Sequence, residues 1–152
     1  MAFRKYRGRT AVKTFIKGAS TAILRGQMVK SDTGRVIRAD SSTNEALIGV
    51  ALDSYALDSS LEPVRVIVPM DLWTEWEIDV DSDGGLVASD VLTFRDLGSD
   101  TNGAGNTVDR SLTANKVIFI TKRISATKCL GVIASSVVNT ASLASIGGAV
   151  ST

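Results

Sequence analysis

Apolar residues along the chain fall into short runs rich in Val, Ile and Thr, separated by Gly, Asp, Ser and Asn. This pattern is typical of β-strands joined by tight turns. Residues 22–30 and 35–39 flank the polar segment 31–34 and predict a β-hairpin, because Gly34 supplies the positive φ that a tight turn needs. No segment sustains a helical period over several turns, so we expect at most one short helix, near residues 41–46.

Three runs in the middle of the chain predict strands with different faces buried. Residues 46–52 are mostly apolar, which favours a strand covered on both faces. In the segment 63–69, valines alternate with other residues and define one apolar face. In the segment 72–80, Trp76 belongs to an apolar face and Trp73 to the opposite, more polar face.

The remaining pattern completes an all-β fold. Residues 86–94 are a strand candidate with a polar interruption, 98–107 a polar loop, 117–124 a strongly apolar strand, and 130–138 the last strand. We therefore predict a compact antiparallel β-barrel, β-tulip or sandwich with an extended N-terminal arm and a C-terminal tail.

The sequence divides into a basic N-terminal arm (1–19), a single β domain (20–138) and a low-complexity tail (139–152). Within the domain, residues 48–54 resemble residues 130–136. Two related β-units would explain this similarity, and so would chance, because Gly-Val is common in apolar strands.

Composition narrows the function. The chain has 152 residues, a net charge of +1 and no histidine. Without histidine it cannot build a Ser-His-Asp triad, a Cys-His pair or a histidine metal site. The single cysteine, Cys129, lies in an apolar run, and we expect a buried, inert thiol. No run is long enough to predict a membrane span. We expect no cofactor, and a structural or binding protein rather than an enzyme.

Two features are candidates for docking a partner. The N-terminal arm is uniformly cationic, and its aromatic residues could anchor it on a protein or stack on nucleic-acid bases. Trp73 lies on a charged strand face, which is typical of a protein interface, although a segment of the same chain could also cover it. For so short an arm we favour protein over nucleic acid, and we take as docking residues Phe3, Arg4, Lys5, Tyr6, Arg7, Arg9 and Trp73.

An acidic turn is a candidate cation site. Asp79, Asp81 and Asp83 alternate and are followed by Gly84, as in the first half of a calcium loop, and Asp90 falls where the last ligand would lie. However, the last ligand of such loops is usually Glu, and the flanks predict strands rather than helices. A solvated hairpin turn needs the same residue types and is the alternative.

The order of these elements resembles the decoration, or cement, proteins on the outside of tailed-phage capsids. The resemblance rests on the hairpin at 26–34, the run Leu-Ile-Gly-Val-Ala at 47–51, the Val-rich strand at 64–68, the Asp-Gly-Gly turn at 83–85 and the run at 86–92. It is a similarity of pattern over roughly residues 20 to 95, and Ser89-Asp90 stands where that family usually has a glycine.

The resemblance implies a non-enzymatic role on the outer surface of the virion. Such proteins bind the major capsid protein, commonly as homotrimers, and strengthen the shell, and many weak contacts on a lattice add up through effective concentration. A nucleic-acid-binding β-barrel that uses the basic arm is one alternative, which the net charge argues against. A tail or adaptor subunit of the virion is another.

Overall fold

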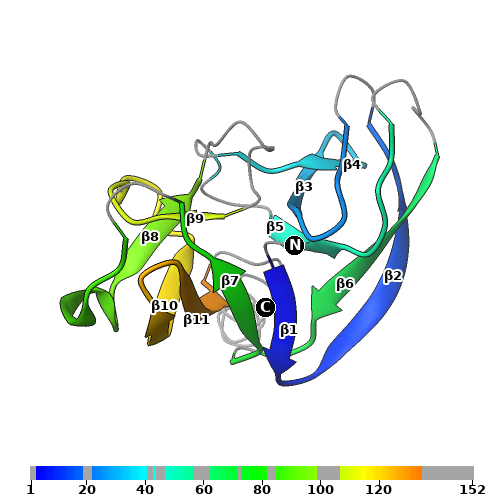
Figure 1. Cartoon of the computed structure of the whole chain (residues 1–152). Coiled ribbons are helices and arrows are strands. Elements are labelled where there is room, and N and C mark those ends of the chain that lie inside the picture. Colours follow the sequence, from blue (N-terminus) through cyan, green and yellow to red (C-terminus); the bar gives the residue numbers. More distant parts are fainter. Residues whose placement is uncertain are drawn as a thin grey trace, which may run out of the picture.

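The fold consists of two curled antiparallel β-sheets. A computed structural model of the chain describes residues 3–18, 22–40, 43, 47–56, 62–71, 73–81, 85–98 and 107–134. The first sheet has the strand order β2-β6-β5-β3-β4, and the second has the order β1-β7-β11-β10-β8-β9 (Figure 1). The all-β prediction is confirmed, and the arrangement is compatible with a barrel or sandwich.

We call β2–β6 the first half and β7–β11 the second half. The strands of the first half are β2 (Thr10–Ile16), β3 (Met28–Asp32), β4 (Arg35–Arg38), β5 (Leu47–Ala51) and β6 (Pro63–Pro69). Those of the second half are β7 (Glu75–Asp79), β8 (Phe94–Leu97), β9 (Val108–Asp109), β10 (Ile118–Ser125) and β11 (Lys128–Ile133), and β1 (Phe3–Arg7) pairs with the outer edge of β7.

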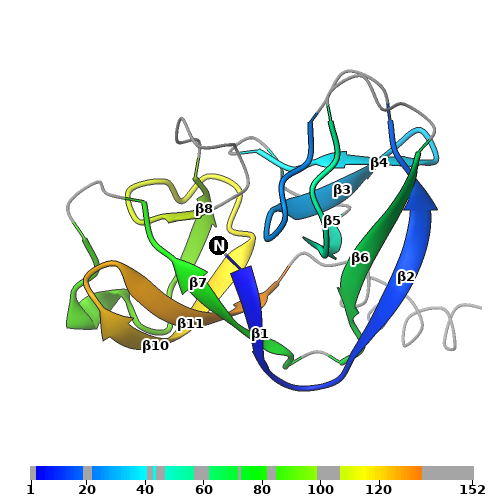
Figure 2. The same cartoon turned by 45° about the vertical axis from the view of Figure 1, so that its right-hand side comes forward.

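The two halves repeat one topology. In each, the first strand pairs with the fifth, the fifth with the fourth, the fourth with the second, and the second with the third. Each half curls until the end of its first strand meets its third strand through a parallel bridge. The bridge joins Lys17 to Val36 in the first half and Val80 to Val108 in the second. Figure 2 shows the halves side by side, joined by the bend between β1 and β2.

Hydrogen bonds outside the strands repeat as well. Lys17 N–H donates to the residue just before β6 at 2.9 Å, and Val80 N–H donates to the residue just before β11 at the same distance. After the first strand, each half has a short connection closed by a polar side chain. Gln27 Oε1 accepts from the Leu24 N–H at 2.7 Å, and Asp90 Oδ2 accepts from the Val87 N–H at 2.8 Å.

The structure therefore has two related β-units, but the sequence similarity between 48–54 and 130–136 does not mark them. That similarity aligns β5 with β11, whereas the shared topology makes β10 the counterpart of β5, and β11 the counterpart of β6. Both segments lie on inner strands of their sheets, where packing favours Gly, Val and Ile on any topology.

The core extends over both halves. One buried cluster contains the interior of the second half together with Met28, Leu47 and Val50 of the first half, and a second cluster fills the first half. Cys129 is buried in the larger cluster, as predicted, and burial raises the pKa of its thiol to about 12.

The hairpin and the central strands form where the sequence pattern predicted them. The β3–β4 hairpin turns at Thr33 and Gly34, both with positive φ. All five residues of β5 are buried. In β6 the three valines are buried and Arg65 is exposed. In β7 the side chains of Trp76 and Ile78 point into the core.

Two predictions about strands are wrong. The basic arm is not separate from the domain, because residues 3–16 form β1 and β2, one at the edge of each sheet. Residues 86–94 do not form a strand. Residues 88–90 make a 3-10 turn instead, and the next strand, β8, begins at Phe94, because the Asp90 side chain bonds back to the Val87 backbone.

Several predicted segments lie outside the described residues: most of 41–46, most of the loop 98–107, and the tail 139–152. Within the part of the chain that the structure describes, no helix has the length and apolarity needed to cross a membrane.

Gly49 of β5 leaves no room for a side chain. A Cβ there would lie 2.1 Å from the Ile67 carbonyl oxygen on β6. We expect Gly49→Ala to lower the free energy of unfolding by about 3 kcal/mol, because the central strands must separate to admit the methyl group. Urea unfolding measures this. Gly34→Asn is the control, since a side chain there meets nothing within 4 Å and Asn tolerates its positive φ. Equal stability losses would contradict the close approach.

Candidate docking surface

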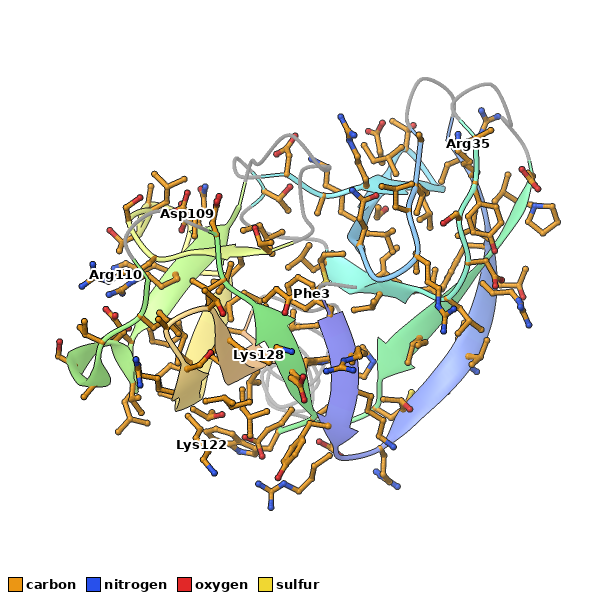
Figure 3. All side chains as sticks on the ribbon, viewed as in Figure 1. Phe3, Arg35, Asp109, Arg110, Lys122 and Lys128 are labelled. Atoms are coloured by element: carbon orange, nitrogen blue, oxygen red, sulfur yellow. The ribbon has the colours of Figure 1, made fainter. Side chains whose placement is uncertain are left out.

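The predicted docking residues of β1 divide between surface and core. Arg4, Tyr6 and Arg7 are exposed, whereas Phe3 is only 1% exposed and packs in the cluster shared by the two halves. Figure 3 shows Phe3 at the centre of the molecule. Phe3 is therefore a core residue, and its place among the docking residues is wrong. The strand alternation that buries Phe3 is invisible in a segment dominated by cations.

The cations of β1 have acidic partners on β7. Arg4 pairs with Glu77, and the Arg7 guanidinium donates to Glu75 from Nε at 2.9 Å and from Nη2 at 2.7 Å. The Lys128 ammonium of β11 also lies 3.2 Å from the Glu77 carboxylate. Burial opposes the charge of Glu77, but the hydrogen bonds from Lys128 and Arg4 lower the pKa of this carboxyl below its usual value. Much of the positive charge of β1 is therefore balanced within the chain.

The corner between β1 and β2 lies directly against the connection between β6 and β7. Gly8 has φ +104°, and a Cβ there would lie 2.7 Å from the Thr74 Cα. Only glycine fits this approach, for both backbone conformation and space. Across the contact, Thr74 Oγ1 donates to the Arg9 carbonyl at 3.0 Å.

Asp71 fixes this corner and the residue beside it. Its carboxylate accepts from the Arg9 N–H and from the Trp73 N–H, each at 3.0 Å. Thr74 Oγ1 lies 3.1 Å from the carboxylate and shares its single proton between Asp71 and the Arg9 carbonyl. The hydrogen bond from the Arg9 backbone is the main cause that lowers the pKa of the Asp71 carboxyl below its usual value. The backbone of Trp73 is thus held in one position while its side chain stays 65% exposed.

Together these residues line an open groove of about 680 Å³, formed by Arg7, Gly8, Asp71, Trp73 and Glu75. Two residues predicted to dock a partner, Arg7 and Trp73, meet there although they are far apart in sequence. The groove combines the exposed apolar indole of Trp73 with charged side chains of both signs. This surface can bury Trp73 against an apolar partner and satisfy polar groups at its rim.

The candidate cation residues do not assemble in the described structure. Asp90 is buried, and its oxygens accept from Arg95 at 3.0 Å and from Arg110 at 2.9 Å. Burial on its own would raise the pKa of Asp90, but the Val87 N–H and the guanidinium groups of Arg110 and Arg95 lower it below its usual value. Asp90 is therefore the centre of an ion-pair cluster, and its expected role as last calcium ligand is contradicted.

The other acidic residues of the turn are only partly described. Asp79 lies 3.9 Å from the Lys128 ammonium, and the Asp81 N–H bonds to the Val108 carbonyl as part of the closure of the second half. Asp83 lies outside the described residues. Among the residues with described positions, no three acidic or cysteine side chains gather in a way that could hold a metal ion. Cation binding by Asp79, Asp81 and Asp83 stays a prediction.

A scan of the chain against models of known protein families gives no match, and a search of the curated proteins gives none either. The fold defines an all-β protein with two antiparallel sheets that repeat one strand topology.

The Asp90 cluster gives a prediction about acid stability. Because the pKa of Asp90 in the folded state is lowered, its stabilising effect is complete above the usual carboxyl pKa of about 4 and disappears as the pH falls through the lower value. We expect Asp90→Asn to lower the free energy of unfolding at neutral pH by about 3 kcal/mol, because it leaves the mostly buried Arg95 unpaired.

Urea unfolding of the wild type and of Asp90→Asn at neutral pH and near pH 3 measures this effect. The difference between their free energies of unfolding should be smaller near pH 3 than at neutral pH. Asp32→Asn on the exposed end of β3 is the control and should stay within about 0.5 kcal/mol of the wild type. A larger difference in free energy of unfolding near pH 3 would contradict the stabilising role of the ionised Asp90.

Proposed function

We propose that the chain is a structural virion protein that binds the major capsid protein on the outer surface of a phage capsid and strengthens the shell. The similarity of its sequence pattern over roughly residues 20 to 95 to the capsid decoration family supports this role, and the all-β architecture agrees with it.

The observation that carries the proposal is the groove around Trp73. An exposed tryptophan whose backbone is fixed by Asp71 loses little further backbone freedom on binding, so most of the burial energy of the indole contributes to affinity. Interfaces obtain most of their energy from a few such aromatic and arginine residues. On a shell with many identical sites, even a modest affinity per groove gives stable coverage.

The ion pairs of β1 weaken the alternative of a nucleic-acid-binding barrel. Phosphate binding depends on cations that are free to replace counterions, and Arg4 and Arg7 are already paired with Glu77 and Glu75. We expect no binding to single-stranded DNA at moderate salt, measured by fluorescence anisotropy. Binding that falls steeply as salt rises would favour the nucleic-acid function instead.

Trp73→Ala tests the docking surface. The probe is an empty shell assembled from the major capsid protein of the same genome, and co-sedimentation measures binding. We expect the wild type to saturate the shell, and Trp73→Ala to weaken binding at least about 30-fold, the effect of losing a residue worth about 2 kcal/mol. Stability should hardly change, since the side chain is largely in solvent.

Leu92→Ala is the matched control, because Leu92 is as exposed as Trp73 but lies on the turn before β8. It should bind like the wild type. Wild-type protein that ignores the shell would refute the decoration role. Shell binding that Trp73→Ala leaves intact would keep the role but exclude the groove as the docking surface.

A further inference from the structure

The outer edge of β2 is open in the described structure. Among the described residues, β2 pairs along its length with β6 alone, and β4 meets it only beyond Ile16, through Lys17 and Gly18. The outward-facing apolar side chains are well exposed, 55% for Val12 and 43% for Ile16. In Figure 2, β2 lies along the outer margin of its half.

Backbone N–H and C=O groups along the open edge of β2 are oriented to form hydrogen bonds with another strand. The Arg9 carbonyl accepts from Met70 at 2.8 Å and the Lys17 N–H donates to Glu62 at 2.9 Å, so odd-numbered residues of β2 direct their hydrogen bonds toward β6. In an antiparallel pair the intervening residues direct theirs away. The N–H and C=O groups of Thr10, Val12 and Thr14 therefore point to the open edge.

The second half of the structure shows which kind of strand pairs with the edge equivalent to that of β2. The counterpart of β2 is β7, and β1 covers the corresponding edge of β7 at Glu75–Ile78 in antiparallel pairing. Charge selects that partner, because Arg4 and Arg7 of β1 face Glu77 and Glu75. At the equivalent positions of β2 the sequence has Val12 and Thr14, which carry no charge. The β2 edge therefore suits a strand whose residues at the hydrogen-bonded positions are uncharged and β-branched.

We propose that this strand is β2 of a second copy of the chain, paired antiparallel about a two-fold axis at Val12. The sheet of the first half then continues across the axis into its partner. Self-pairing is chemically matched, since both edges present threonine and valine. The inference goes beyond the proposed function and does not depend on it, and it gives a dimer where the family similarity implies a trimer.

The register follows from three constraints. Outward-facing residues must lie opposite outward-facing residues, so the axis can pass through Val12, Lys13 or Thr14. An axis at Lys13 sets two ammonium groups directly opposite each other, which is unfavourable. An axis at Thr14 places Val12 opposite Ile16, where β4 begins to close the edge. With the axis at Val12, Thr10 lies opposite Thr14 and Lys13 opposite Ala11.

Complementary charges at position 12 test this pairing. Light scattering should give the full-length wild type a mass of two 16.0-kDa chains. Val12→Lys and Val12→Glu should each give monomers, because each places two like charges on the axis, and mixing the two variants should restore the dimer. Ile124→Lys on β10 is the control, with similar exposure, and should remain dimeric. Circular dichroism verifies that every variant is folded.

A disulfide tests the register without charge. Opposed residues that exchange hydrogen bonds have Cα atoms about 5.5 Å apart, a separation that a disulfide spans. Val12→Cys should therefore form a covalent dimer on mild oxidation, and Ile124→Cys should not. Three results would each overturn the proposal. The wild type could be a monomer or a trimer, Val12→Lys could remain a dimer, or the mixture of Val12→Lys and Val12→Glu could stay monomeric.

Discussion

The two halves of this protein are held together where the chain turns from β1 into β2. β1 belongs to one sheet and β2 to the other, so the corner at Gly8 has to cross between sheets within a very short segment. It can do so because Gly8 adopts φ +104° against the Thr74 backbone and because Asp71 receives the Arg9 N–H. The same contact places Phe3 in the shared core and positions Trp73 beside Arg7. Core and candidate docking surface thus depend on one backbone approach.

The two halves share one topology but use different side chains to close equivalent connections. The connection after the first strand of each half is closed by a side chain three residues along, but the groups differ: Gln27 in the first half and Asp90 in the second. A neutral amide needs no counter-charge, whereas the buried carboxylate requires Arg95 and Arg110. The second half therefore has an ion-pair cluster at a position where the first half has a single side-chain hydrogen bond.

The local sequence pattern was enough to predict these elements: alternation for β6 and β7, a continuous apolar run for β5, and the polar turn with Gly34 for the β3–β4 hairpin. It did not predict β1, whose cations are balanced by Glu75 and Glu77 only after the chain has folded back on itself. The segment 86–94 shows the reverse error, since its apolar residues suit a strand but one hydrogen bond to Asp90 favours a turn. Trp73 could be selected from its position on a polar face, whereas Gly8 and Asp71 become part of the site only through a tertiary contact.

The burial of Cys129 has a practical consequence for following the motions of this protein. It is the only cysteine in the chain, and a thiol with a pKa of about 12 in the core cannot react with alkylating reagents while the strands around it stay closed. Each modification therefore records one opening of the larger core cluster. The dependence of the labelling rate on denaturant concentration separates local opening from global unfolding without any introduced probe, because global unfolding exposes more surface.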